Sequence, residues 1–297
     1  MEKNSSWDQA PLREVVRQGA SGAERGGERG GEPGGDRGRE LVCSLEEGAL
    51  VLARQEYPDL DPQPWLTRLD GIADLARPML SEEPDPPEIV GVLNDVLFRD
   101  LGFHGNQDDY YDPRNSFLND VLERRAGIPI SLSTVYMAVA RRVGLDLRGT
   151  NFPGHFLVVH ERAGWPIIID AFDRGRILTR EDCEERIARL REVGWSPTYL
   201  APVSDLAILR RMLHNLKEIY FDRRDWERLL RTAAQVLVVS PEDHDEHFTC
   251  GVALAGMGEL RDSIGELERY LAMRPEAMNR DQVLDLLSDL RRRLIRL

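Results

Sequence analysis

Two short runs of β-branched and aromatic residues lie between segments that show helical periodicity, and they limit the fold more than any other feature. The runs are Phe156–His160 and Pro166–Phe172, both rich in Val, Ile and Phe. Glu161–Gly164 between them has the composition of a hairpin loop. Apolar side chains recur at helical spacing before and after this hairpin. The pattern therefore predicts an α+β fold class.

The predicted hairpin brings a histidine beside an aspartate. If it turns symmetrically about residues 162 and 163, His160 faces Trp165 and His155 faces Asp170. Directly opposed residues have Cβ atoms about 4.5–5.5 Å apart, so the aspartate can accept a hydrogen bond from one imidazole nitrogen. The other nitrogen is then available as a base. The alternative is a structural pair that fixes the register of the hairpin.

A nucleophile for such a base is expected at the start of a helix. There the helix dipole lowers a pKa, and backbone amides can stabilise an oxyanion. A helix is predicted from Ser131 to Val143 and is ended by Gly144. Ser131 and Ser133 are therefore the candidate hydroxyl groups. The alternative role of Ser131 is to cap the helix.

Composition divides the chain into three predicted parts. Residues 1–40 are rich in Gly, Arg and Glu, and we expect a disordered leader because so little apolar surface is available for burial. Residues 41–200 hold amphipathic helices followed by the hairpin. Residues 201–297 have helical periodicity, and Pro241 and Pro275 are 34 positions apart. This is the period of a tetratricopeptide unit, so the tail is predicted to be a helical repeat.

Charge and cysteine content exclude several classes of protein. The net charge is −13, so no nucleic-acid partner is expected. Cys43, Cys183 and Cys250 are far apart, which argues against a zinc cluster or a disulfide framework and favours reduced thiols. His244 and His247 fit a solvated polar turn better than a metal site. We expect no metal and no cofactor.

The N-terminal residues lack the apolar stretch of a signal peptide, and the longest apolar runs are too short to cross a bilayer. A cytoplasmic location without a membrane partner is therefore expected.

Several segments together resemble the transglutaminase-like superfamily. They are most similar to its bacterial SirB-type regulators, in which this domain is joined to a tetratricopeptide-type tail. The matching segments are Tyr110–Ser116, Leu118–Asn119, Arg125–Ser133, Asn151–Leu157 and Ile169–Phe172. The resemblance covers about residues 41 to 297 and implies a papain-like central domain preceded by helices and followed by an all-α tail.

The resemblance also implies roles for individual residues. In catalytic members of the superfamily, Gly-x-Cys opens the core helix, and a His and an Asp follow on adjacent strands. His155 and Asp170 match the second and third members of this set. The Gly-x-Cys position falls on Gly127–Pro129, and a proline cannot be a nucleophile. The SirB-type branch shares this cysteine-less pattern, so the resemblance implies the fold rather than thiol acyl transfer.

Three functional hypotheses follow from these observations. The first is a non-catalytic or regulatory protein that binds a peptide or protein partner through its cleft and its helical tail. The second is a hydrolase or protease in which Ser131 attacks, His155 is the base and Asp170 orients it. The third is a structural scaffold. The residues expected to line the cleft are Tyr110, Tyr111, Arg114, Asn115, Ser133 and Asn151.

Overall fold

The computed structural model describes residues 10–18, 39–190 and 194–296. The chain forms two compact units. We call residues 43–208 the central unit, and the described residues of 1–42 and 209–297 the helical unit. The two are described separately. No helix among the described residues is long and apolar enough to cross a membrane.

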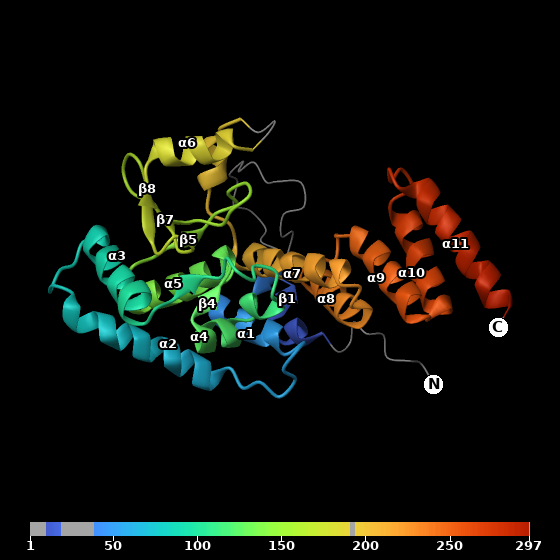
Figure 1. Cartoon of the computed structure of the whole chain (residues 1–297), viewed down its shortest axis with the longest axis horizontal. Helices are drawn as coiled ribbons and strands as arrows, with labels where there is room; N and C mark the ends of the chain where they lie inside the picture. Colours follow the sequence, from blue (N-terminus) through green and yellow to red (C-terminus); the bar gives the residue numbers. More distant parts are fainter. Residues whose placement is uncertain (1–9, 19–38, 191–193, 297) are drawn as a thin grey trace. The chain divides into compact units, whose positions relative to one another are not determined.

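Six α-helices of the central unit lie among its described residues (Figure 1). They are α1 (Leu45–Ala53), α2 (Gln63–Ala76), α3 (Pro86–Asn94), α4 (Leu118–Arg124), α5 (Pro129–Arg142) and α6 (Arg180–Ala188). Ser44 caps α1 as its side chain accepts a hydrogen bond from the backbone N–H of Glu47 at 3.3 Å. Helix α5 is buried from Pro129 to Ala140 and contacts α1, α2, α3 and α4, so it forms the centre of the unit.

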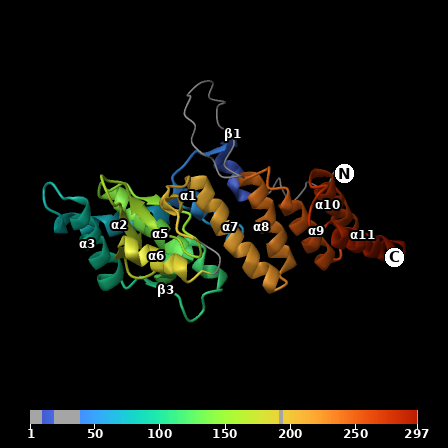
Figure 2. The same ribbon diagram turned by 90° about the horizontal axis from the view of Figure 1, so that it is seen from above.

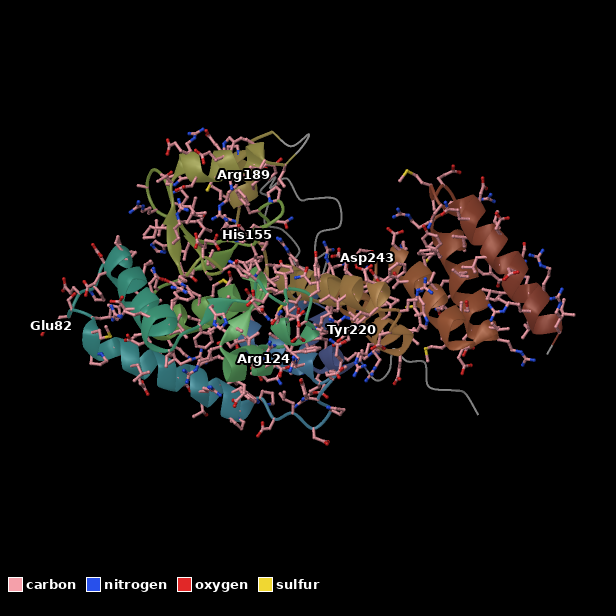
Figure 3. All side chains as sticks on the ribbon, in the orientation of Figure 1. Glu82, Arg124, His155, Arg189, Tyr220 and Asp243 are labelled. Atoms are coloured by element: carbon pink, nitrogen blue, oxygen red, sulfur yellow. The ribbon has the colours of Figure 1, made fainter. Side chains whose placement is uncertain are left out.

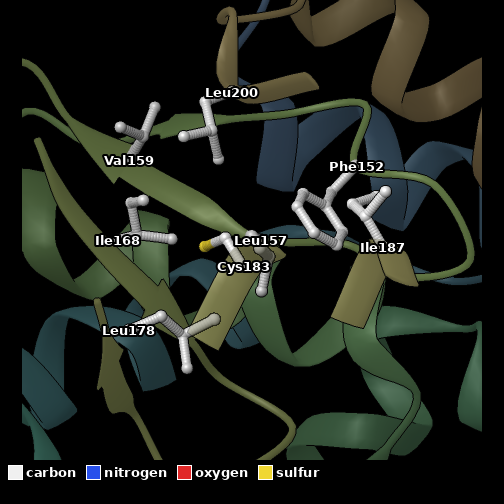
Figure 4. Close-up of a cluster of buried hydrophobic side chains, with 8 residues drawn as sticks. All are labelled: Phe152, Leu157, Val159, Ile168, Leu178, Cys183, Ile187 and Leu200. Atoms are coloured by element: carbon white, nitrogen blue, oxygen red, sulfur yellow. The ribbon is translucent and has the colours of Figure 1, made fainter. Parts of the chain in front are cut away.

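A four-stranded antiparallel sheet lies beside these helices, with the strand order β5-β6-β7-β8. Its strands are β5 (Arg148–Gly149), β6 (Val158–His160), β7 (Ile167–Asp170) and β8 (Arg176–Leu178). Two further short strands, β3 (His104–Gly105) and β4 (Ala126–Gly127), pair in parallel. The sheet and α6 enclose a hydrophobic cluster (Figure 4). Its members are Phe152, Leu157, Val159, Ile168, Leu178, Cys183, Ile187 and Leu200.

The predicted hairpin exists, but its predicted register is wrong. His160 pairs with Ile167 instead of Trp165, and Val158 pairs with Ile169. This displaces the pairing by two residues from the symmetric turn. A strand has a side-chain period of two, so an even displacement keeps the same side chains on the same face of the sheet. His155 precedes β6 and can therefore still reach the face that carries Asp170.

Helices α8 to α11 of the helical unit pack in chain order, and Figures 1 and 2 both show them side by side. The helices are α7 (Asp205–Asp222, entering from the central unit), α8 (Trp226–Val239), α9 (Asp245–Met257), α10 (Leu260–Met273) and α11 (Arg280–Ile295). Helices α8 and α10 each have 14 residues and begin 34 positions apart. The predicted repeat period is therefore the spacing of equivalent helices.

The expectation of a disordered leader is wrong for residues 10–18. Pro11–Glu14 forms a 3₁₀ turn that contacts α8, and β1 (Val16–Gln18) pairs with β2 (Arg39–Leu41) in an antiparallel ribbon. Leu12 and Val16 are buried, and this local apolar content offsets the ordering entropy. The prediction for residues 1–9 and 19–38 lies outside the described residues.

Candidate functional site

His155 and Asp170 form the pair that the sequence predicts. The distance between His155 Nε2 and Asp170 Oδ1 is 2.9 Å. Asp170 ends β7, and its side chain is 1% exposed, while the side chain of His155 is 18% exposed. The carboxylate is therefore part of the interior and the imidazole reaches the surface. This arrangement fixes the orientation of the ring.

Asp170 has further partners that the sequence analysis missed. Arg186 in α6 places Nη1 2.7 Å from Oδ2 of Asp170. The backbone N–H groups of Phe172 and Asp173 donate to Oδ1 at 3.1 and 3.2 Å. Burial alone raises the pKa of Asp170, but the hydrogen bond from His155, the Arg186 charge and the Asp173 N–H outweigh it, so this pKa lies below its usual range. Asp170 therefore stays ionised.

An aromatic row leads from His155 to the surface. The ring of Phe172 lies 6.1 Å from His155 on one side and 6.1 Å from Tyr110 on the other, and Tyr110 contacts Tyr111 at 5.3 Å. Tyr110 is 40% and Tyr111 is 66% exposed. A side chain in place of Gly105 would collide with the Phe172 ring, so β3 provides the space for this ring. Two of the predicted cleft residues are thus connected to His155 through Phe172.

Asn115 and Arg114 have supporting roles near this row. Asn115 is fully buried, so the prediction that it lines a cleft is wrong. Its Nδ2 donates to the carbonyl groups of Asp109 and Tyr110 at 2.7 and 3.2 Å, which holds the tyrosine loop in place. Arg114 is exposed and forms an ion pair with Asp112 at 2.7 Å. Its guanidinium helps to hold the pKa of Asp112 below the usual range, against the opposing effect of burial.

Ser131 is engaged with the backbone. It is fully buried in the first turn of α5, and its Oγ accepts from the backbone N–H of Ile128 at 3.1 Å. The same hydroxyl lies 2.6 Å from the carbonyl oxygen of Asn115 as a donor. Helix α5 begins at Pro129 with Ile128 as its N-cap, so Ser131 is the third helical residue, and its hydroxyl satisfies the N-cap backbone N–H from inside the helix. Ser133 is also fully buried, so it lines no cleft, and its hydroxyl has no hydrogen-bond partner among the described residues.

The thiols are no better placed. Pro129 is the first residue of α5, where the resemblance puts a cysteine. Cys183 is fully buried in the hydrophobic cluster, and burial raises its pKa to about 11 (Figure 4). Burial raises the pKa of Cys43 to about 12 and that of Cys250 well above its usual value. A thiolate is the reactive form of cysteine, so these three environments suppress nucleophilic chemistry.

A polar pocket of about 400 Å³ adjoins the pair on the side of Arg186. It is lined by Asp173, Arg176, Asp182, Glu185, Arg186 and Arg189. Figure 3 shows His155 and Arg189 on the side of the central unit that carries α6 and the sheet. Arg176 forms an ion pair with Asp182, and Arg186 is held by Asp170, so the pocket is polar and largely charge-balanced. Asn151, another predicted cleft residue, lies in the exposed loop before Phe152.

One group of potential metal ligands occurs among the described residues, in the helical unit. One ligand atom each of His214, Asp243 and Glu246 lies within 4.8 Å of the others. Lys217 forms an ion pair with Glu246, so a cation already occupies this cluster. His247 is buried and contacts Glu266 at 2.7 Å, which makes the interpretation as a solvated turn wrong for this residue.

Comparison with known proteins identifies the family. A family model described as transglutaminase-like superfamily matches residues 63–214. The chain belongs to this superfamily. A tetratricopeptide repeat model matches residues 216–288, which contain α8 to α10 and most of α11. The predicted fold class is therefore confirmed: a transglutaminase-like domain is followed by an all-helical repeat tail. The assignment to the SirB-type branch stays a prediction.

Relatives of this transglutaminase-like protein occur in bacteria and in animals. A UPF0162 protein of Xylella fastidiosa is 38% identical, over 82% of this chain and 88% of the relative. A UPF0162 protein of Pseudomonas aeruginosa is 31% identical over 76% of this chain and 82% of its own length. F-box only protein 21 of Mus musculus is 37% identical, over 46% of this chain and 23% of that protein. No solved structure matches the chain significantly.

Proposed function

We propose that this chain is a non-catalytic, regulatory member of the transglutaminase-like superfamily. It binds a peptide or protein partner through the surface around His155 and through its helical tail. The observation that carries this proposal is the environment of the candidate nucleophiles, the Ser131 hydroxyl and the three cysteine thiols. The Ser131 hydroxyl is buried and bonded to backbone groups, and the three cysteines lie where burial raises their pKa.

The aromatic row supports binding at this surface. Tyr110 and Tyr111 are large side chains that present apolar rings and hydroxyl groups to the solvent. Tyrosine is enriched in the centres of protein interfaces because it buries much area and loses little conformational freedom. Phe172 and the loop anchored by Asn115 hold these rings in position. A surface that is ordered before binding loses less entropy when its partner arrives.

A photo-crosslinking experiment tests this proposal. Tyr111 is replaced by p-benzoylphenylalanine in the full chain, and Leu75, which is 53% exposed on α2, is replaced in a matched control. We expect a discrete cross-linked protein at position 111 that is absent at position 75. An addition of Arg114→Glu, beside the aromatic row, should reduce its yield. Identical products at both positions would contradict the proposal.

The geometry of the His155–Asp170 pair favours one second candidate, a serine hydrolase. Asp170 orients the imidazole as the aspartate of a catalytic triad does, although it contacts Nε2 where the serine-protease aspartate contacts Nδ1, and His155 remains partly exposed. Intact-mass labelling with a reactive serine phosphonate separates the two functions. We expect no adduct on the wild-type chain. A single adduct on Ser131 that disappears in His155→Ala would replace the binding function by the hydrolase function.

A further inference from the structure

A second pocket lies within the helical unit, between the N-terminal ribbon and the repeat helices. Its volume is about 510 Å³. The ribbon contributes Val16, Gln18 and Arg39, and Arg13 precedes it. The helices and their connections contribute Ala234, Leu237, Val238, Pro241, His247 and Arg269. Residues separated by more than 200 positions in the sequence thus share one cavity.

The charge of this pocket is opposite to that of the chain. Three arginines and one histidine line it, none of the lining residues is acidic, and Glu266 beside the pocket pairs with Arg269 and His247. The chain as a whole carries −13. This local excess of guanidinium groups attracts an anion that the rest of the chain repels at longer range.

The basic side chains are held in place by neighbouring groups. Arg39 donates from Nη1 to the carbonyl oxygen of Val238 near the end of α8. Arg269 Nη1 donates to Glu266 Oε1 at 2.9 Å, and His247 contacts the other oxygen of Glu266 at 2.7 Å. A fixed guanidinium loses little entropy on binding a carboxylate, and its planar fork can make two parallel hydrogen bonds.

The remaining wall of the pocket is apolar. Val16 and Val238 are buried, and Leu237 is partly buried beside Ala234. A simple inorganic anion would leave this wall unused. The pocket therefore suits a molecule that carries an anionic group next to an apolar side chain.

We infer that this pocket binds an acidic segment of a protein partner. A carboxylate of the segment meets Arg39 and Arg269, and an adjacent apolar side chain packs on Val16 and Leu237. The tetratricopeptide match covers the helical part of the wall, and such repeats generally mediate contacts between proteins. The inference rests on the proposed function, since it names the chemistry of a partner segment at the helical tail.

Fluorescence anisotropy with a defined probe tests the pocket in the full chain. The probe is a fluorescein-labelled octapeptide of alternating Glu and Leu, and the matched peptide alternates Lys and Leu. We expect binding of the acidic peptide alone, weakening as salt is raised. Arg269→Glu should reduce the affinity at least roughly tenfold, because the attraction between Arg269 and the carboxylate of the peptide becomes a repulsion. The milder Arg269→Gln should reduce it less.

Arg261→Glu is the matched control, because Arg261 is an exposed residue of α10 that does not line the pocket. Its affinity should stay within about twofold of wild type. Absence of binding to the wild-type chain, or equal losses in Arg261→Glu and Arg269→Glu, would overturn the inference. Displacement of the peptide by equimolar inorganic phosphate would also overturn it, by showing a simple anion site. If the peptide experiment fails and the cross-link at position 111 still forms in Arg269→Glu, the inference about the pocket is wrong and the proposed function is unaffected.

Discussion

Asp170 in the central unit and Glu246 in the helical unit are carboxylates of equal burial, since each side chain is 1% exposed. Their surroundings differ. Asp170 receives His155, Arg186 and two backbone N–H groups. Glu246 pairs with Lys217 through Oε1, and its Oε2 has no hydrogen-bond partner among the described residues.

The difference in partners determines the direction in which each pKa is shifted. Burial raises the pKa of both groups, but the partners of Asp170 bring its pKa below the usual range, whereas the Lys217 charge leaves the pKa of Glu246 raised. The number of donors therefore matters more than the depth of burial. A carboxylate with a full set of hydrogen-bond donors can orient a histidine. A buried carboxylate with one oxygen that accepts no hydrogen bond lowers the stability of the folded state.

The largest effect is expected from Asp170→Asn, which removes the charge and keeps the shape. Arg186 and His155 then face a neutral amide, and the free energy of unfolding should fall by about 3 kcal/mol. Urea denaturation followed by tryptophan fluorescence measures this loss. Asp173→Asn is the control, because its side chain is 55% exposed. A difference between the two variants of less than about 1 kcal/mol would remove the contrast between Asp170 and Glu246.

Lowering the pH should reduce the difference in the free energy of unfolding between the wild type and Asp170→Asn. A free aspartate has a pKa of about 3.9, and the pKa of folded Asp170 is lower. The stability that ionised Asp170 contributes is complete above the unfolded value and is lost as the pH falls through the folded value. Urea denaturation of both proteins between pH 7 and pH 2.5 checks this sign. A difference in the free energy of unfolding that stays constant over that pH range would contradict this prediction.

The two buried serines of α5 repeat the contrast on a smaller scale. Ser131 has backbone partners on both sides, and Ser133 has none among the described residues. Ser131→Ala should cost about 1 kcal/mol through the lost hydrogen bonds to the Ile128 N–H and the Asn115 carbonyl, while Ser133→Ala should be neutral or stabilising. Thermal unfolding of both variants measures the difference. Equal losses would mean that the hydrogen bonds of Ser131 contribute nothing.

The smallest effect is expected from Glu246→Gln. The substitution removes a charge that burial disfavours, but it also weakens the pair with Lys217, so stability at pH 7 should change by less than about 1 kcal/mol. Because the pKa of folded Glu246 is raised, its ionisation costs stability as the pH rises above about 4.3. The free energy of unfolding of the variant, relative to that of the wild type, should therefore be higher at pH 7 than at pH 4. Glu218→Gln, at an exposed position on α7, should show no such trend.

The His155–Asp170 pair could be predicted despite a wrong register because the face of a strand depends only on the parity of the pairing. The exact displacement of two residues depends on a turn whose geometry the local composition did not specify. Arg186 was missed, although a signal exists. It lies between Cys183 and Ile187, both buried, on the inner side of α6. An arginine among apolar positions at helical spacing indicates a buried anion nearby.

Some of the predicted cleft residues are exposed and others are buried, for a physical reason. Tyr110 and Tyr111 are exposed, whereas Asn115 and Ser133 are buried. Loop composition does not reveal which polar side chain turns inward to satisfy backbone groups, because that depends on tertiary contacts. The helical tail was easier to predict. Its 34-residue period depends on local repetition, and α8 and α10 reproduce it.

The ribbon of β1 and β2 makes the helical unit discontinuous along the chain, since its parts lie on both sides of residues 43–208. A ribosome therefore releases all of the central unit before the helices that cover Leu12 and Val16 are made. The first strands must wait through most of translation for their packing partners, while the central unit can already fold. Removing the first 42 residues would cut into the helical unit, and a translational pause after residue 208 would leave its N-terminal part without its core.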